Sequence, residues 1–414
     1  MILEECHKVK SGYYIINGRD CKALAKLRQS PITSQDIRKS ILAKWHDDFS
    51  RYGDLFSSNS ISGSTPPSVF VGSYNYPKVF AGPMVPPIHG DTVLFDRPEK
   101  WTGKTLADIV NFRLNMIRGI KNVSIHDTES RYVEDLQDIA MSSKSIDSDL
   151  VFHKTVSRTV LADDQNAPFG PVGEIKDARF SGTSSVKPIE KVFYDKSLRS
   201  REAVLALYKS GIDVSGIQRC FSMGMLGQKR ILVPTKWSIT ATDDIISKSL
   251  ISEILDFPVI DSCRVFSYAH LGNLFSVVLF PHRWLYEITE AWHSGDILGF
   301  GSDFENARGI DHRPSTAGAY FAARLGVAEY LHKKKTQSGA IVLREICPEY
   351  AIPVGVWQIR EGIRNAMKDK PLIADDFDHA LVLASQNMSI SKSEWLLHGN
   401  IAKLVKQKTI SDYF

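Results

Sequence analysis

The sequence lacks most of the features that would place a chain of 414 residues in a compartment. Five cysteines are too few for a disulfide framework at this length. No apolar run approaches the ~18 residues that a membrane-spanning helix needs. The longest, within 273–281, is typical of a buried strand. The N-terminus has no basic segment followed by an apolar one, so we expect no signal peptide and a cytoplasmic protein.

The sequence also lacks the common phosphate-binding motifs and a strong charge of either sign. Neither GxxxxGK[ST] nor GxGxxG is present. The 51 Lys and Arg residues nearly balance 47 Asp and Glu residues, which leaves a net charge of +4. A protein that binds nucleic acid over much of its surface carries a larger positive charge. Any DNA binding must therefore come from a local patch of basic side chains.

A zinc site at the N-terminus is incomplete on these residues. A four-ligand site needs two close pairs of thiolates or imidazoles. Residues 1–30 contain Cys6 and Cys21, so each pair has one member, and His7 is too close to Cys6 to share the ion with it. A remote ligand would have to complete the site. The alternatives are free thiols or a Cys6–Cys21 bridge.

Length and ordinary composition predict a mixed α/β or α+β protein with a large two-lobed core. We place a small Cys-containing segment at 1–30, lobes at 31–162 and 163–388, and a flexible tail at 389–414. Apolar periodicity predicts helices over 34–52, 106–120, 200–209, 281–292, 315–335 and 354–367. Strands are predicted over 230–233, 264–269, 274–280 and 340–345, and a loop over 57–67. Another helix is expected to be capped by Thr242, with Asp243 and Asp244 in its first turn.

Aromatic and basic side chains in three stretches are candidate nucleic-acid contacts, because rings stack on bases and cations neutralise phosphates. These residues are Tyr74, Tyr76 and Lys78; Arg113 and Arg118; Lys236 and Trp237. The alternatives are a packed hairpin for the first stretch and solvated arginines on a helix for the second. Lys236 and Trp237 precede a predicted helix start, a place that suits phosphate.

Ionisable residues in the second half are candidate catalytic groups, namely Asp243, Asp244, Lys236, His282, Glu287 and Arg324. Two-metal phosphodiester chemistry needs several carboxylates converging on ions about 4 Å apart, and no such acid cluster is evident in the sequence. Structural roles are the alternatives. The two aspartates would complement a helix dipole, and Arg324 would form an ion pair with Glu329.

The last eight residues carry a spaced set of anchors, Gln407, Ile410, Tyr413 and Phe414. One short 3₁₀ turn would bring the aliphatic and the two aromatic side chains to one face. Gln407 can anchor the backbone that enters this apolar plug. Short peptides commonly bind by placing such anchors in a groove of a partner.

This octapeptide resembles the box by which proteins dock on the DNA sliding clamp (PCNA). The whole chain resembles the archaeal Nre DNA-repair family, specifically its NreA branch, which ends in such a box. The resemblance rests on the tail and on residues 68–87, 230–244, 317–331 and 342–367. It implies DNA repair and the sliding clamp as a partner. The family also has a four-cysteine motif at its N-terminus, from which this sequence departs at Val9 and Asn17, so residues 1–30 resemble a degenerate zinc finger.

Three functions follow from these patterns. The first is a clamp-recruited, nucleoid-associated protein that recognises damaged or branched DNA without catalysis. The second is a clamp-recruited metal-dependent nuclease or another phosphate-handling enzyme. The third is an adaptor that carries repair proteins to the clamp and does not itself bind DNA. The resemblance names a process and a partner but no reaction.

Overall fold

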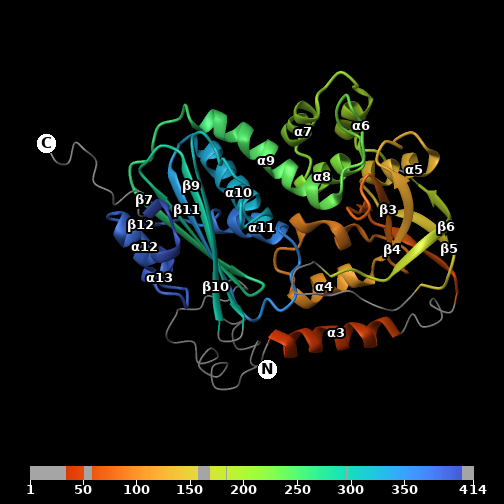
Figure 1. The fold of residues 1–414 in the computed structure, drawn as a ribbon, viewed down its shortest axis with the longest axis horizontal. Helices are drawn as coiled ribbons and strands as arrows, with labels where there is room; N and C mark the ends of the chain where they lie inside the picture. Colours follow the sequence, from red (N-terminus) through yellow and green to blue (C-terminus); the bar gives the residue numbers. More distant parts are fainter. Residues whose placement is uncertain (1–33, 51–57, 157–167, 183, 295–296, 403–414) are drawn as a thin grey trace. The chain divides into compact units, whose positions relative to one another are not determined.

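The computed structural model describes residues 34–50, 58–156, 168–182, 184–294 and 297–402. These residues form an α/β protein with two mixed β-sheets, as predicted (Figure 1). The cysteine-containing segment at 1–30 and the predicted clamp-binding box at 407–414 lie outside the described residues. Within those ranges, no helix is both long and apolar enough to cross a membrane.

The chain divides into two compact units, each built around one sheet. Among the described residues, the N-terminal unit contains Arg38–Ile246 and Ile352–Gly355, and the C-terminal unit contains residues 34–37, Ser247–Ala351 and the chain from Val356 to residue 402. The division falls inside helices α3 (Ser34–Ser50) and α9 (Thr235–Ile254). The boundary predicted at 162–163 lies outside the described residues, and the N-terminal sheet takes strands from both sides of it.

The N-terminal sheet has the strand order β1-β5-β6-β4-β3-β2. Its strands are β1 (Ser60–Thr65), β2 (Val69–Val71), β3 (Lys78–Val85), β4 (Ile117–Ser124), β5 (Ile146–Phe152) and β6 (Val172–Ser181). All neighbours are antiparallel except β4 and β6, which are parallel. In β5 the buried Ile146, Ser148 and Leu150 alternate with exposed aspartates, as expected for a strand with one covered face.

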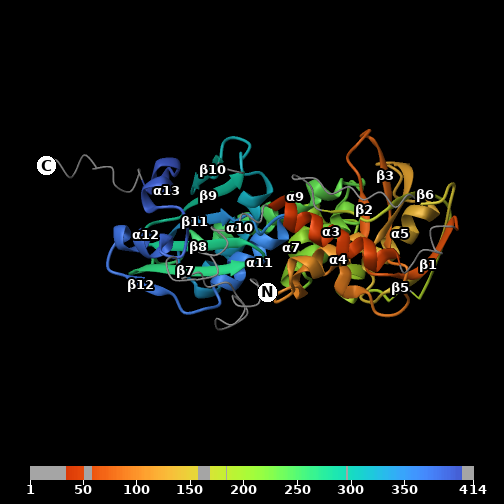
Figure 2. The same ribbon diagram turned by 90° about the horizontal axis from the view of Figure 1, so that it is seen from below.

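The helices that precede α9 in the chain are labelled in Figure 1, and Figure 2 shows the same fold from below. They are α3 (Ser34–Ser50), α4 (Leu106–Asn115), α5 (Arg131–Met141), α6 (Lys187–Tyr194), α7 (Ser200–Lys209) and α8 (Val214–Ser222), with the 3₁₀ turns η2 (Val93–Asp96) and η3 (Pro98–Lys100). Helix α4 begins with a capping box between Thr105 and Asp108, which satisfies two backbone N–H groups at the helix start.

The C-terminal sheet has the order β10-β9-β11-β8-β7-β12. Its strands are β7 (Cys263–His270), β8 (Asn273–Phe280), β9 (Leu285–Ser294), β10 (Ile297–Asn306), β11 (Gly339–Ile346) and β12 (Leu372–Ala374). Strand β11 lies between β8, to which it is antiparallel, and β9, to which it is parallel. Every residue of β8 is buried, as befits a central strand covered on both faces.

Helices cover both faces of the C-terminal sheet (Figure 1). They are α10 (Gly318–Lys334) and α11 (Trp357–Ala366) on one face, and α12 (Phe377–Ser385) and α13 (Lys392–His398) on the other. An apolar core of sheet residues, α12 and α13 includes Val278, Leu343, Leu381 and Trp395. On the opposite face Gly362 of α11 packs so closely on the Phe275 ring that a Cβ would lie 2.5 Å from it.

Two predictions in the second half are wrong. The segment predicted as a helix over 281–292 contains β9 instead. Its polar residues concealed the two-residue period, because Glu287 and Thr289 are buried and hydrogen-bonded to neighbouring groups. The predicted strand 230–233 is irregular, and α9 begins at Thr235 rather than near Thr242. Pro234 lies immediately before Thr235, and a proline is common at the start of a helix because its fixed φ angle suits helical geometry.

Two predictions in the first half are wrong in part. The helix predicted over 106–120 ends at Asn115, and Ile117 begins strand β4. A Cβ at Gly119 of this strand would come within 2.6 Å of the Ile175 side chain of β6, so a larger residue there would require that side chain to move. The loop predicted over 57–67 contains β1, whose Ser64 and Thr65 are buried. The helix over 200–209 and the strands within 264–280 and 340–345 are confirmed.

Candidate nucleic-acid interface

The turn between β2 and β3 exposes two tyrosines. Tyr74 is 76% exposed and Tyr76 is 46% exposed. In this turn Asn75 takes a left-handed backbone conformation with φ of 60°, which asparagine tolerates better than most residues, and Tyr76–Pro77 is a cis peptide bond. The N–H of Lys78 donates to the carbonyl of Asn75 at 2.9 Å, which closes the turn and leaves the lysine exposed at the start of β3.

The first turn of α9 presents a third aromatic ring. Trp237 is 45% exposed, and Lys236 beside it is exposed. Thr235 fixes this helix start on the sheet, because its Oγ1 accepts a 3.0 Å hydrogen bond from the N–H of Val71 in β2. The preceding loop is held by a 2.8 Å bond from the N–H of Leu232 to the carbonyl of Ile125.

These two segments meet at the surface, although they lie far apart in the sequence. The ring centroids of Tyr76 and Trp237 are 5.4 Å apart, with an interplanar angle of 54°. We call the exposed side chains of Tyr74, Tyr76, Lys78, Lys236 and Trp237 the aromatic-basic surface. It combines stacking faces with cations on a rigid backbone, which is the composition that binds unpaired bases and their phosphates.

Arg113 and Arg118 are not solvated helix residues. Arg113 lies in the last turn of α4, where its Nη2 is 3.6 Å from the Asp96 carboxylate and its guanidinium is 5.3 Å from the Trp101 ring centroid. Arg118 lies in β4 and is only 8% exposed. Its guanidinium carbon lies 3.7 Å from the centroid of Phe70 and 3.9 Å from that of Phe169. No local sequence pattern indicates that these two rings enclose an arginine.

The candidate catalytic residues of α9 differ in their surroundings. Asp243 is fully buried in the helix interior, and its Oδ1 accepts a 3.2 Å hydrogen bond from Gln218 Nε2 of α8. The first-turn, dipole-compensating role expected for Asp243 and Asp244 is therefore wrong, since both lie more than two turns inside α9. Lys236 belongs to the exposed surface described above.

The candidate catalytic residues of the C-terminal unit are not brought together. His282 is exposed and contacts the carbonyl of Arg283. The buried Glu287 faces the α13 side, where it accepts hydrogen bonds from the backbone N–H groups of Asn400 at 2.6 Å and Ile401 at 3.0 Å. Arg324 lies in α10 and pairs with Glu305 on the other face of the sheet.

Arg324 and Glu329 each have a different partner from the one expected. Arg324 Nη1 is 2.9 Å from Glu305 Oε2, and its Nε donates to Ser247 Oγ at 3.2 Å. Glu329 pairs with Arg364 of α11 at 2.6 Å. Tyr320 and Trp284 also donate to the Glu305 carboxylate, so this buried charge is well satisfied.

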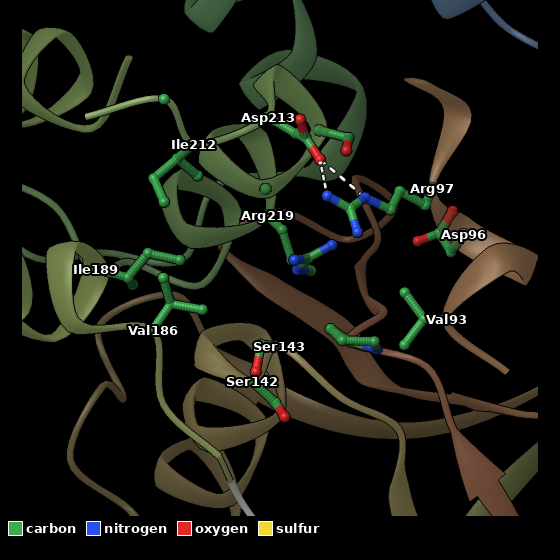
Figure 3. Close-up of a pocket in the computed structure, with 14 residues that line it drawn as sticks. Val93, Asp96, Arg97, Ser142, Ser143, Val186, Ile189, Ile212, Asp213 and Arg219 are labelled. Atoms are coloured by element: carbon green, nitrogen blue, oxygen red, sulfur yellow. Dashed lines mark hydrogen bonds and ion pairs between the residues drawn. The ribbon is translucent and has the colours of Figure 1, made fainter. Parts of the chain in front are cut away.

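A cavity of about 180 Å³ lies elsewhere in the N-terminal unit (Figure 3). Its charged lining residues are Asp96, Arg97, Asp213 and Arg219, and Arg97 pairs with Asp213 at 2.6 Å. Figure 3 shows Arg219 between Asp213 and Ser143. Ser142, Ser143 and Ser215 add hydroxyl groups, and no aromatic ring lines the cavity. It can hold a small polar group, but it offers no platform for stacking a base.

Metal binding has no support in the part of the chain that the structure covers. No group of three or more His, Cys, Asp or Glu side chains there is arranged to hold an ion. Cys6 and Cys21, the candidate zinc ligands, lie outside it. Burial raises the pKa of the Cys220 thiol to about 11, which makes this thiol a poor ligand and nucleophile at neutral pH.

Two models of one protein family match most of the chain. The family model for the N-terminal part of archaeal Nre proteins matches residues 36–298, and the model for their C-terminal part matches residues 305–413. A protein of Archaeoglobus fulgidus named DNA repair protein NreB is 38% identical over 360 residues, which is 85% of this chain and 92% of that protein. DNA repair protein NreA of the same organism is 34% identical, over 84% of this chain and 89% of its own length.

A third relative, DNA repair protein NreA of Haloferax volcanii, is 31% identical over 83% of this chain and 87% of its own length. No solved structure matches the chain. The sequence resemblance and the two matching models agree over nearly the full length. This chain belongs to the archaeal Nre family.

Proposed function

We propose that this protein is a DNA-repair factor that the sliding clamp recruits through residues 407–414 and that recognises damaged or branched DNA. The contact of Tyr76 with Trp237 carries the DNA-binding part of this proposal. Three relatives named DNA repair proteins support the process. A protein of this kind would work at the nucleoid, in the cytoplasm.

Recognition follows from the chemistry of the aromatic-basic surface. Bases in intact duplex are stacked on each other, whereas bases at a lesion, a gap or a fork are free to stack on Tyr74, Tyr76 or Trp237. Lys78 and Lys236 would neutralise the adjacent phosphates, so affinity would fall as salt rises. No bond is made or broken in this scheme. The protein would bind the damaged or branched DNA, and the clamp would bring the protein to that DNA.

The DNA-binding part is tested by fluorescence anisotropy on forked, gapped, single-stranded and intact duplex DNA. Trp237→Ala and Tyr76→Ala should each lower the affinity for forked DNA about five- to hundredfold, the range expected for one lost stacking contact. Tyr194→Ala is the matched control, because Tyr194 is 69% exposed in the same unit but lies on α6. If all three variants bound like the parent protein, this surface would not be the DNA site.

The clamp-binding part is tested separately by calorimetric titration with purified clamp. Replacing both Tyr413 and Phe414 with alanine should abolish binding and leave the melting temperature nearly unchanged. Ser411→Ala, between the anchors, should bind like the parent chain. Clamp affinity that survived the double replacement would exclude the box.

One observation favours the adaptor alternative. Strand β12 lies at the edge of the C-terminal sheet, and its Leu372 and Ile373 are 54% and 58% exposed. Edge strands with exposed apolar side chains are places where another chain can pair. Under this alternative Ile373→Lys would remove a repair partner from clamp-bound complexes, whereas Trp237→Ala would change nothing.

A further inference from the structure

Arg118 is held in an unusual setting for a charged side chain. Its guanidinium lies between the rings of Phe70 in β2 and Phe169 in the chain leading to β6, with both ring centroids within 4 Å of its central carbon. Both rings are only half-buried, so the cluster borders the solvent. Contact with two aromatic rings restrains the guanidinium, and its Nε and Nη2 atoms are buried beside them.

The backbone around this cluster is built to keep both rings in place. The N–H of Arg118 donates to the carbonyl of Pro171 at 2.8 Å, which ties the Phe169 segment to β4. Gly170 lies so close to this strand that a Cβ would be 2.1 Å from the carbonyl oxygen of Met116. Phe70 is held from the other side by the pairing of β2 with β3. The enclosure of Arg118 therefore does not depend on mobile side chains alone.

Two nitrogens of the Arg118 guanidinium lack an acceptor in the part of the chain that the structure describes. Among the described residues, Arg118 Nε and Nη2 are buried without a hydrogen-bond partner, and the same is true of Arg113 Nε. Asp96 is the carboxylate that pairs with Arg113, at 3.6 Å, but its Oδ2 already accepts a 2.5 Å bond from Ser68 Oγ. Asp96 is therefore the carboxylate partner of Arg113 and is already partly engaged, and Arg118 has no ion pair among the described residues.

This arrangement is costly unless an anion completes it. Burial, together with the nearby Arg113, lowers the pKa of Arg118 to about 9, so the side chain is still charged at neutral pH. An uncompensated buried charge costs several kcal/mol, and a buried N–H without an acceptor adds to this cost. Cation–π contact with two rings offsets part of the cost, but it leaves the N–H groups unsatisfied. A tetrahedral oxyanion would satisfy both the charge and the donors.

We propose that Arg118 anchors a phosphate-binding site, with Arg113 beside it and the Phe70 and Phe169 rings as its walls. The Nε and Nη2 groups form the fork that binds two oxygens of one phosphate. The phosphate is either a free anion or the terminal phosphate of a nucleotide or DNA strand. This site goes beyond the aromatic-basic surface and requires neither the clamp nor a DNA fork.

The test is calorimetry and thermal unfolding of the full chain with inorganic phosphate, at constant ionic strength set with chloride. Phosphate should bind and raise the melting temperature of the parent protein, because a ligand that binds only the folded state stabilises it. Arg118→Gln should weaken phosphate binding about ten- to hundredfold, as expected when a bidentate charge-assisted contact is lost. Arg179→Gln is the matched control, since Arg179 is 83% exposed on β6 and its replacement changes the net charge equally.

The Arg118→Lys variant distinguishes the contribution of the two parallel N–H groups to phosphate binding from the contribution of the positive charge. It keeps a cation between the rings but loses the two parallel N–H groups, so it should also weaken phosphate binding while preserving the fold. Equal phosphate affinity in the parent, Arg118→Gln and Arg118→Lys proteins would overturn the proposal, as would the absence of binding to the parent protein. If Arg118→Gln does not fold, the Arg118→Lys result decides.

A second arm identifies the source of the phosphate. A 5′-phosphorylated oligonucleotide and the same strand without the phosphate are titrated into the parent and Arg118→Lys proteins. A preference for the phosphorylated strand that disappears in Arg118→Lys assigns the site to a DNA end. Binding of inorganic phosphate without such a preference assigns it to a free anion. Loss of DNA binding in Trp237→Ala with phosphate binding retained would show that the two surfaces act separately.

Discussion

Two buried arginines, one in each unit, differ in whether a hydrogen-bond acceptor lies beside them. Arg324 and Arg118 are each at least nine-tenths buried, and each lies against two aromatic rings. Arg324 has a carboxylate at 2.9 Å and a serine hydroxyl at 3.2 Å, whereas Arg118 has neither. Burial and aromatic contact therefore do not distinguish a structural arginine from a binding one. The presence or absence of an acceptor does.

The largest expected effect is at the satisfied arginine. Arg324→Met should lower the free energy of unfolding by about 3–5 kcal/mol, because it leaves the buried Glu305 carboxylate without its cation. Urea denaturation measures this value. The exposed pair of Arg179 and Asp177 is the control, and its loss should cost less than about 1 kcal/mol. If Arg324→Met lowered the free energy of unfolding only slightly, the hydrogen-bond acceptors beside Arg324 would not distinguish it from Arg118 in stability.

The next largest effect concerns pH and a buried histidine, His270. Burial lowers the pKa of His270 to about 4 from its usual 6.5, so the folded protein keeps this imidazole neutral. The unfolded chain binds the proton more tightly, and stability should fall by about 3 kcal/mol as the pH drops from 6.5 to 4. His270→Gln should remove this part of the pH dependence, whereas exposed His126→Gln should not. Denaturation curves between pH 4 and 7 would measure the difference.

The unsatisfied arginine should respond in the opposite direction. Without phosphate, Arg118→Met should raise the free energy of unfolding by about 1–3 kcal/mol, because it replaces an uncompensated charge with an apolar side chain of similar length. The same urea experiment compares this value with that of Arg324→Met. Destabilisation by several kcal/mol in phosphate-free buffer would mean that the aromatic contacts alone account for Arg118.

The smallest effect on stability is expected at the aromatic-basic surface. Tyr74→Ala and Trp237→Ala remove exposed side chains, and each should change the free energy of unfolding by less than about 0.5 kcal/mol. Their effect should appear in DNA affinity instead. A large loss of stability would show that these rings serve the fold, as a packed hairpin would require.

Some of these features follow from local sequence, and others depend on long-range contacts. The helix at 200–209 and the strands around 264–280 have regular apolar patterns and punctuating glycines, so they were predictable. Strand β9 was not, because Glu287 and Thr289 point into the protein and have buried partners. Sequence patterns assign polar residues to solvent, and this rule fails wherever a carboxylate holds another segment in place.

The candidate sites show the same limit. Tyr76 and Trp237 were each predicted from their residue type, but their contact depends on how Thr235 binds β2. The enclosure of Arg118 needs Phe169, which is 51 positions away, and no local pattern links these two residues. Residue type suggested phosphate, whereas only the fold revealed the missing acceptor.

Glu287 holds the chain in place shortly before the C-terminal peptide that we propose to bind the clamp. Its buried carboxylate holds the backbone of Asn400 and Ile401 against the C-terminal sheet. Gln407 lies six positions after Ile401, so even a fully extended chain between them spans at most about 20 Å. A clamp that holds residues 407–414 would thus keep the C-terminal unit on a short tether, at a high effective concentration beside the DNA that the clamp encircles. Glu287→Ala would lengthen that tether without changing any anchor of the box.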